Sequence, residues 1–292
     1  MNKSKFVRDV TGSAHDSLSH QVACRSRELR LLPFTGSLSF GFLTIAFVAE
    51  ETWLQYIVDH FIDDLSDLAM ATVQLTGSGE QLEVKKIFCI GRNYADHAKE
   101  MKAAVPEAPV FFLKPPTAII GDGGRICIPS ISKELHHEVE MTVLIGRGGK
   151  DIQRGNALNH VSGYGIGLDM TLRDLQSEAK KKGLPWTLSK GFDTSAPLSP
   201  FVSASEIRDP HDLGLKLDVN GVSRQQSSTA NLIFKIDELI AYISQFFTFE
   251  RGDIIFTGTP EGVAPVASGD QLVAQLLSST HTVLASLRVS VQ

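Results

Sequence analysis

The sequence predicts an α+β protein that is built mostly of β-strands. From about Val84 onward, short runs of apolar and β-branched residues alternate with turn residues. Only two longer stretches in this part, 171–182 and 236–246, have the spacing of helices. The chain contains neither a GxGxxG motif nor a Walker loop, which excludes the common nucleotide-dependent α/β enzymes. An apolar content of 42% with 21% charged residues is ordinary for a folded globular protein.

The first 84 residues differ in character from the rest and predict an N-terminal extension of uncertain role. Residues 1–36 are polar without a clear period, so we expect a disordered start. An amphipathic helix is predicted over 50–70, because apolar residues recur there at helical spacing; these are Trp53, Ile57, Phe61, Leu65 and Leu68. Its simplest role is packing against the next domain or another subunit. Residues 76–79 (TGSG) then predict a linker or turn, and a second domain over 85–292.

The apolar stretch 40–49 is the one segment that raises the question of a membrane. Its ten residues are too few to cross a bilayer, which takes about 20. It also lies too deep in the chain for a typical signal peptide, so we expect either a buried strand or an artefact of an early start codon. The three cysteines have no CxxC spacing, which argues against a disulfide framework or a zinc knuckle and fits a reducing, cytoplasmic compartment.

The net charge of −5 is confined to the N-terminal extension. Residues 1–84 carry 6 Lys and Arg against 11 Asp and Glu (6 − 11 = −5), while residues 85–292 carry 22 of each. No basic block is present, so the electrostatics predict no nucleic-acid partner. We also expect no membrane partner, because the polar face of the predicted helix over 50–70 is acidic.

The strands of the second domain follow from short apolar runs. We expect them at 86–90, 110–113, 139–145, 164–168, 215–219, 253–256 and 282–289. Asn220 and Gly221 follow the run LKLDV directly, and this dipeptide favours a tight hairpin turn. The domain is therefore predicted to contain at least one antiparallel hairpin.

Two glutamates lie at the start of the predicted apolar strand 139–145, one just before it and one within it. Glu138 and Glu140 share one face, while the alternate residues from Val139 to Ile145 are apolar. Unpaired buried carboxylates cost several kcal/mol each, so a divalent cation is a natural partner. Asp169 ends the segment GYGIGLD and is the candidate third ligand, which predicts an Mg²⁺ or Mn²⁺ site. Two alternatives stay open: solvated glutamates on an exposed strand, and a zinc site that uses His136 or His137.

The predicted helix after Asp169 has features of an anion-binding site. Thr171 and Asp174 have the spacing of a capping box, and Gly183 is placed to end the helix. Arg173 and Gln176 are three residues apart, so they share a face near the positive helix end. The alternative is a surface arginine that pairs with Asp174. Lys190, isolated among apolar and aromatic residues, is either a site residue or an ordinary exposed lysine.

A third candidate cluster follows the strand KIFCI. The segment GRNYADHAKEM (91–101) places polar residues at the end of a strand, where functional side chains often lie. In a helix over 94–101, His97 and Glu100 face the same way. A carboxylate beside an imidazole orients it and raises its basicity, which suits activation of water. A solvated helix face is the alternative.

Taken together, these segments resemble the fumarylacetoacetate hydrolase family, most of all its acylpyruvase and oxaloacetate decarboxylase branch. The resemblance covers residues 85–290. It depends on the motifs GRNYADHAKEM (91–101), FLKPPTA (112–118), HHEVEM (136–141), GYGIGLDMTLRDLQ (163–176), KKGLPWTLSKGFD (181–193), VNGVSRQ (219–225) and GDIIFTGTPEGV (252–263). The segment after Arg224 and Gln225 departs from the family pattern, because Ser227 and Ser228 stand where a glycine is common.

The resemblance implies a mixed β-sandwich roll, a homodimer, and a catalytic domain over 85–292 that binds Mg²⁺ or Mn²⁺. It implies that the enzyme hydrolyses the C–C bond of acylpyruvates to a carboxylic acid and pyruvate, with possible decarboxylation of oxaloacetate; the substrate is a small 2-oxo acid. The alternative is an isomerase or decarboxylase of a hydroxymuconate-type dienoate. By this resemblance the metal ligands are Glu138, Glu140 and Asp169, the catalytic residues are His97, Glu100 and Lys190, and the substrate-binding residues are Arg92, Arg173, Gln176 and Thr259.

Overall fold

The structure is a computed structural model that describes residues 36–40, 43–47, 71–101 and 104–292. The chain divides into two units, Met1–Ala69 and Met70–Gln292. In the first unit, β1 (Gly36–Phe40) pairs antiparallel with β2 (Leu43–Phe47), which falls in the apolar stretch where we expected a strand. The predictions for residues 1–35 and for a helix over 50–70 lie outside the described residues.

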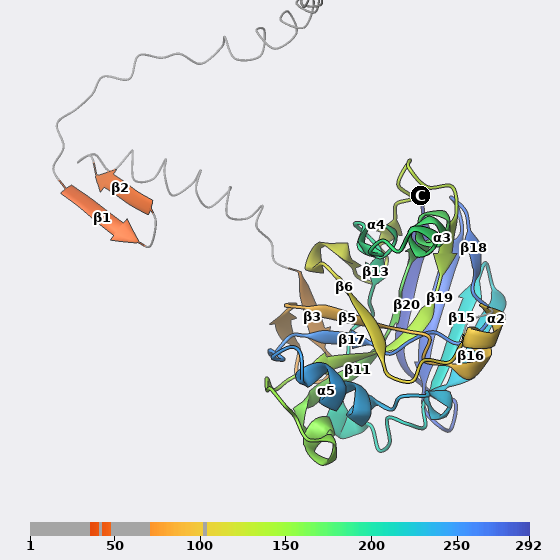
Figure 1. The fold of residues 1–292 in the computed structure, drawn as a ribbon. Coiled ribbons are helices and arrows are strands. Elements are labelled where there is room, and N and C mark those ends of the chain that lie inside the picture. The colour runs from red at the N-terminus through yellow and green to blue at the C-terminus, as the bar shows by residue number, and fades with distance from the viewer. Residues whose placement is uncertain (1–35, 41–42, 48–70, 102–103) are drawn as a thin grey trace, which may run out of the picture. The chain divides into compact units, whose positions relative to one another are not determined.

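The main sheet of the second unit contains most of the predicted apolar runs. Its six strands lie in the order β14 (Val202–Ser203), β11 (Val161–Leu168), β10 (Val139–Ile145), β17 (Ile254–Phe256), β5 (Ile87–Gly91) and β6 (Val110–Lys114). Neighbouring strands are antiparallel except for β17 and β5, which are parallel, so the sheet is mixed (Figure 1).

A second sheet of five strands packs against the first. Its order is β16 (Val222–Ser228), β15 (Gly214–Val219), β19 (Gln271–Leu277), β20 (Val283–Val291) and β8 (Arg125–Ile126). The predicted hairpin turn is present between β15 and β16. Asn220 and Gly221 have φ values of 52° and 75°, the positive φ pair that a tight hairpin turn requires.

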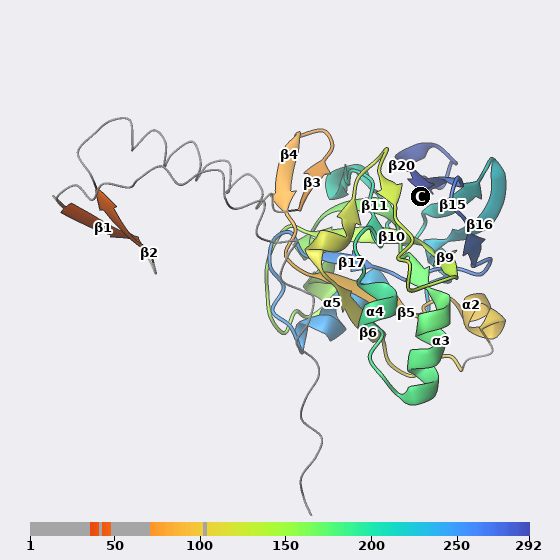
Figure 2. The same cartoon turned by 90° about the horizontal axis from the view of Figure 1, so that it is seen from above.

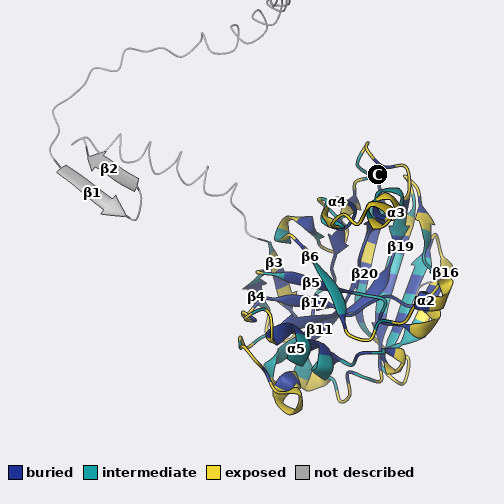
Figure 3. Ribbon diagram, viewed as in Figure 1, coloured by how far each residue is buried: buried dark blue, intermediate teal, exposed yellow. Residues whose placement is uncertain are grey.

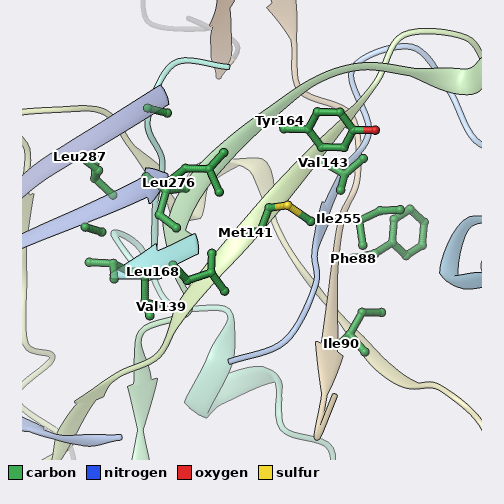
Figure 4. Packing of buried hydrophobic residues seen from close by; sticks show 14 of the residues in the cluster. Phe88, Ile90, Val139, Met141, Val143, Tyr164, Leu168, Ile255, Leu276 and Leu287 are labelled. Atoms are coloured by element: carbon green, nitrogen blue, oxygen red, sulfur yellow. The ribbon is translucent and has the colours of Figure 1, made fainter. Parts of the chain in front are cut away.

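The hydrophobic core lies between these two sheets. The apolar face of β10, with Val139, Met141 and Val143, packs in one cluster with Leu276 of β19 and Leu287 of β20 (Figure 4). Each such buried side chain stabilises the fold by about 1.5–3 kcal/mol. The predicted fold class, a mostly β protein with a mixed sandwich, is therefore confirmed.

A smaller sheet joins the two larger ones near the predicted ligands. Its strands are β12 (Thr171–Leu172), β9 (Leu135–His137) and β18 (Ala264–Val266). Glu138 lies between β9 and β10, so the chain passes from the three-stranded sheet to the six-stranded sheet at this residue. A further two-stranded pair consists of β13 (Ala196–Pro197) and β7 (Ile119–Ile120).

The hairpin of β3 (Thr72–Leu75) and β4 (Glu80–Glu83) packs on the back of the main sheet. Residues 76–79 form its turn. Val73, Leu75 and Leu82 are buried in a cluster with Phe201 and Phe256. This hairpin lies within the predicted extension 1–84 but belongs to the second compact unit. The division of the chain at residue 84 stays a prediction.

The α-helices lie along one side of the sheets (Figure 2). Residues 95–100 and 173–182 expose part of their surface, whereas none of residues 236–244 is exposed (Figure 3). The α-helices are α2 (Ala95–Glu100), α3 (Arg173–Lys182), α4 (Thr187–Lys190) and α5 (Ile236–Ser244). The 3₁₀ helices are η1 (Pro116–Ala118), η2 (Arg154–His160), η3 (Ala204–Glu206) and η4 (Thr229–Asn231). Within the described part of the chain, none of the helices has both the length and the apolar character needed to cross a membrane.

The prediction that Thr171 and Asp174 form a capping box at the start of α3 is wrong, whereas the predicted end of the helix at Gly183 is confirmed. The N-cap is Leu172, without a side-chain cap, because Thr171 instead pairs with β9 and its Oγ1 donates to the Asp169 carbonyl at 3.1 Å. The Asp174 carboxylate accepts from Ser132 Oγ at 2.7 Å. At the other end, Gly183 has a φ of 66°, the left-handed conformation expected of a terminating glycine.

Candidate active site

Strand register brings the three predicted carboxylates together. Glu140 of β10 lies opposite Gly167 of β11, and the next hydrogen bond runs from Asp169 N to Glu138 O at 2.8 Å. Side chains two residues apart share a face of a strand, so all three carboxylates project from the same end of this strand pair. Each has an oxygen within 4.8 Å of the others, and none of the three residues is more than 5% exposed. The alternative of solvated glutamates is therefore wrong.

Three cationic side chains surround this cluster. Lys190 Nζ donates to Glu138 Oε2 at 2.7 Å and to Asp169 Oδ2 at 2.6 Å. Arg173 pairs with the other oxygen of Glu138, and Lys114 Nζ lies 2.9 Å from Asp169 Oδ1. Lys190 is only 2% exposed, which excludes the alternative of an ordinary exposed lysine. Among these six residues the charges balance.

Glu140 is the carboxylate of the cluster that has no cationic partner among the described residues. Its Oε2 accepts from Gly258 N at 2.7 Å. Burial, together with the nearby Asp169 and Glu138 carboxylates, raises the pKa of Glu140 well above its usual value. Burial also acts to raise the pKa of Glu138, but Lys190 and Arg173 outweigh this effect and hold it well below the usual range.

This donor set fits a hard divalent cation. Carboxylate oxygens are the ligands that Mg²⁺ and Mn²⁺ prefer, and a buried carboxylate without a cation is compensated when one binds. The two histidines considered for zinc lie elsewhere. His136 contacts Glu134 and His137 contacts Gln225, and neither belongs to the carboxylate group. The carboxylate triad is thus the candidate metal site within the described residues.

The glycines beside Asp169 let protein atoms, not a ligand, approach the strand. A Cβ on Gly167 would lie 2.7 Å from Phe256 Cε1, and one on Gly163 would lie 2.8 Å from Leu75 Cδ1. The face that carries Glu140 and Asp169 therefore continues into the second apolar cluster. This packing holds β11 closely against β17 and the β3–β4 hairpin.

A cavity of about 330 Å³ lies over the carboxylates. Nine of the ten predicted site residues line it, and these are Arg92, His97, Glu138, Glu140, Asp169, Arg173, Gln176, Lys190 and Thr259. The tenth, Glu100, contacts His97 from behind. Phe112, Trp186 and Lys180 add an apolar wall and a further cation that the sequence analysis did not identify.

Helix α3 presents its predicted pair to this cavity. Arg173 Nη1 donates to Gln176 Oε1 at 2.6 Å, and both side chains are buried. The arginine pairs with Glu138 and not with Asp174, so the alternative of a surface pair is wrong. At the cavity mouth, Arg92 has a φ of 58°, a left-handed conformation that costs a non-glycine residue about 1–3 kcal/mol and concentrates at functional sites.

The predicted pair on α2 is formed. His97 Nδ1 lies 3.1 Å from Glu100 Oε2, and His97 is only 6% exposed. Because an ionised carboxylate only accepts, Nδ1 carries the hydrogen, and in the neutral ring Nε2 therefore keeps its lone pair. The other oxygen of Glu100 accepts from Gly262 N at 3.1 Å, which fixes the carboxylate to the turn after Thr259. This arrangement can remove a proton from a molecule in the cavity.

The turn that carries Thr259 depends on residues that the sequence analysis did not assign. Gly258 has a φ of 101°, and a Cβ there would lie 2.6 Å from the Cβ of Asn93. Asn93 is fully buried, and its Nδ2 donates to Thr257 O at 2.8 Å. Asn93, Lys114 and Gln225 are all buried polar residues within the quoted motifs. Their place in those motifs was the only signal that could have identified them.

Known proteins share this arrangement of sequence and fold. Residues 86–292 match the sequence family described as fumarylacetoacetate (FAA) hydrolase C-terminal. Oxaloacetate tautomerase FAHD1 from Bos taurus is 50% identical over 190 residues, which covers 65% of this chain and 86% of the relative. The Arabidopsis thaliana protein of the same name is 49% identical over 189 residues, with 65% and 85% covered.

Solved structures agree. Fumarylpyruvate hydrolase from Pseudomonas aeruginosa, in complex with Mn²⁺ and pyruvate, superposes with a TM-score of 0.71 at 38% identity and covers 77% of this chain and 97% of that one. The 5-carboxymethyl-2-hydroxymuconate delta-isomerase from Mycobacterium smegmatis gives a TM-score of 0.62 at 37% identity, with 73% and 85% covered. With its core, its carboxylate triad and its matched residues, the chain belongs to the fumarylacetoacetate hydrolase family, whose named relatives here are enzymes.

Proposed function

We propose that this protein hydrolyses acylpyruvates, using bound Mg²⁺ or Mn²⁺, to a carboxylic acid and pyruvate. One observation carries the proposal. His97 and the carboxylate triad line the same cavity, so a proton acceptor and a candidate cation site can both act on one small molecule bound there. The Mn²⁺ and pyruvate in the Pseudomonas aeruginosa structure support both the ion class and the product.

The candidate cation site has a defined chemical purpose. Glu138, Glu140 and Asp169 would hold the ion, which as a Lewis acid would polarise the oxygens of the 2-oxo acid. Arg173 and Gln176 line the same cavity, and we propose that they bind the substrate carboxylate. A planar guanidinium suits this purpose because it pairs with carboxylates in two parallel hydrogen bonds.

The protein's own groups account for the proton transfers. His97 Nε2 takes a proton from water, and Glu100 stabilises the resulting imidazolium. The hydroxide adds to the distal carbonyl, and the C–C bond then breaks so that its electron pair stays on the pyruvate fragment as an enolate. Lys190 stabilises this negative charge. The proton on His97 is finally available to the enolate carbon, which gives pyruvate and the carboxylic acid.

Conversion of oxaloacetate is the second candidate function. The relatives named oxaloacetate tautomerase, at about half identity, favour it. Moving a proton between carbon and oxygen of oxaloacetate passes through the same kind of enolate, as does loss of CO₂, and neither reaction consumes water. The same side chains could therefore serve hydrolysis of acylpyruvates and both tautomerisation and decarboxylation of oxaloacetate. An isomerase of hydroxymuconate-type dienoates stays the alternative, supported by the Mycobacterium smegmatis neighbour at lower identity.

Turnover by the purified full-length chain tests the proposal. Acetylpyruvate, fumarylpyruvate and oxaloacetate are each supplied with Mg²⁺, with Mn²⁺ and with EDTA, and pyruvate release and enol absorbance are followed. We expect pyruvate from both acylpyruvates only when a metal is present. Enol–keto conversion of oxaloacetate without hydrolysis of either acylpyruvate would assign the second function instead. Full activity in EDTA would refute metal dependence.

Three further predictions accompany this function. We propose a homodimer, which light scattering measures directly. We also propose that neither nucleic acid nor membrane is a partner, and that the protein acts in the cytoplasm. The mammalian and plant relatives carry the word mitochondrial in their names, so fractionation of cells that express the full chain is the appropriate test.

A further inference from the structure

Gln225 is a buried polar residue that the proposed mechanism does not use. It lies on β16 within the segment VNGVSRQ and is 1% exposed, while its neighbours Arg224 and Gln226 are exposed. A buried amide needs hydrogen-bond partners for both its NH₂ group and its oxygen, because each group left unpaired costs about 1–3 kcal/mol. Its side-chain hydrogen bonds reach two segments beside the carboxylate triad, residues 137–139 and residues 259–261.

Two backbone groups fix the orientation of this amide, because one can only donate and the other can only accept a hydrogen bond. Val139 N donates to Oε1 at 3.0 Å, and Nε2 donates to the Pro260 carbonyl at 2.9 Å. A backbone N–H can only donate and a carbonyl can only accept. His137 Nδ1, at 2.9 Å from the same Oε1, must therefore also donate. Gln225 thus connects the start of β10 to the turn that carries Thr259.

The second N–H of Gln225 determines what Thr259 can do. Nε2 donates to Thr259 Oγ1 at 2.9 Å, so this oxygen is an acceptor in that bond. The hydroxyl hydrogen is then left to donate, and among the described residues Thr259 Oγ1 has no other hydrogen bond. Thr259 lines the cavity and is 3% exposed. Its hydroxyl is accordingly a buried donor beside the space for the substrate.

The same turn also positions the proton acceptor. Gly262 N donates to Glu100 Oε1, and Gly262 has a φ of 93°. A Cβ on Gly262 would lie 2.3 Å from the Arg224 carbonyl, so the turn rests directly on the backbone beside Gln225. The turn that carries Thr259 therefore also holds the carboxylate that orients His97.

We propose that Gln225 is a positioning residue, which makes the Thr259 hydroxyl a hydrogen-bond donor to a negatively charged oxygen of the substrate. The inference rests on the proposed function, since the oxygen in question belongs to the 2-oxo acid or its enolate. A donor that is fixed in advance toward a developing negative charge contributes most in the transition state. Gln225 acts on the reaction through Thr259 and does not itself touch the substrate.

A double-mutant cycle tests this coupling in the full-length protein with acetylpyruvate and Mn²⁺. Thr259→Val removes the hydroxyl and should lower kcat/KM by about 100-fold, the lower range for loss of one such donor. Thr259→Ser keeps the hydroxyl and should stay close to the wild type. Gln225→Met should lower kcat/KM by about 10- to 100-fold, mainly through kcat. The double variant should be no worse than Thr259→Val alone, within about threefold.

Two further variants keep the test decisive. Gln226→Met makes the same substitution at the exposed neighbour and should not change activity. Gln225→Glu keeps the acceptor for Val139 and His137 but loses the donor, so it replaces Gln225→Met if the latter melts at a much lower temperature, with the same expected loss. Losses that multiply in the double variant, or full activity in either folded Gln225 variant, would overturn the inference. Absence of any turnover by the wild type would instead overturn the proposed function.

Discussion

Replacement of Lys190 by methionine is the most direct test of the electrostatics of the carboxylate cluster. The change keeps the length and apolar character of the side chain but removes an ammonium group that donates to Glu138 Oε2 and Asp169 Oδ2. The side chains of Glu138 and Asp169 are only 7% and 2% exposed. Neither can recover the lost partner from solvent without rearrangement of the site.

The expected cost follows from this burial. Removing one partner of a buried ion pair costs about 3–5 kcal/mol, because the other charge is left without compensation. Arg173 and Lys114 still contact the two carboxylates, so we expect the loss of unfolding free energy to be near the lower end of this range, about 3 kcal/mol. For a domain of this size, 1 kcal/mol corresponds to about 2–4 °C in melting temperature. Lys190→Met should therefore melt about 6–12 °C below the wild type in EDTA.

A bound divalent cation should return much of this stability. The cation would neutralise the same carboxylate oxygens, and a ligand at 100 times its Kd adds about 2.7 kcal/mol. The assay is thermal and urea denaturation of both proteins, with EDTA and with Mn²⁺. Activity should stay low in both conditions because the charge that stabilises the enolate is missing.

Lys182→Met is the matched control, at the end of the preceding helix α3. Lys182 pairs with Glu178 at 2.5 Å, but the two side chains are 60% and 57% exposed. Exposed pairs of this kind contribute about 1 kcal/mol or less. If Lys190→Met destabilises the metal-free protein no more than Lys182→Met does, the argument from a buried, charge-balanced cluster is wrong.

Four other predictions follow from the same geometry. In EDTA, the contribution of Glu140 to stability should be lost as pH rises above about 4.3, because the folded state with its raised Glu140 pKa holds that proton more tightly than the unfolded chain. Relative to the wild type, Glu140→Gln should therefore gain stability between about pH 5 and pH 7 in EDTA, and it should melt lower than the wild type in Mn²⁺. His97→Ala should suppress acylpyruvate hydrolysis at least 10-fold more than oxaloacetate decarboxylation, which needs no water; equal losses would exclude the proposed base. Lys180 lines the cavity without a carboxylate partner among the described residues, so Lys180→Met should lower kcat/KM about tenfold for fumarylpyruvate, a dianion, and little for acetylpyruvate. A chain that starts at residue 71 should be more stable in urea than one that starts at residue 85, which lacks the buried side chains of the β3–β4 hairpin.

The sequence alone predicts those parts of the site that local periodicity determines. Alternation along residues 138–145 separates the apolar face from the two glutamates, and the structure confirms this division. The three-residue spacing of Arg173 and Gln176, and of His97 and Glu100, likewise puts each pair on one face of a helix. These relations hold within a single element and need no knowledge of the tertiary fold.

The remaining site residues could not be assigned because their partners are distant in the chain. Lys114 contacts Asp169, and Gln225 contacts Val139 and Pro260, across dozens of residues that fold into several strands. Thr171 shows the opposite error. Its spacing to Asp174 is that of a capping box, but pairing with β9 takes the residue into a strand. Tertiary contacts override local preferences at such positions.

The pairing of β10 with β11 has a consequence for refolding. A shift of one residue would move Met141 and its apolar neighbours to the face now occupied by Glu140 and would place both glutamates against the core. Such a slipped pairing would be strongly unfavourable, because two glutamate carboxylates would replace apolar side chains in the core. A molecule that regains its native core after denaturation therefore regains all three carboxylates in place. If the triad binds a cation as proposed, the amount of metal bound after refolding should then equal the number of correctly folded molecules.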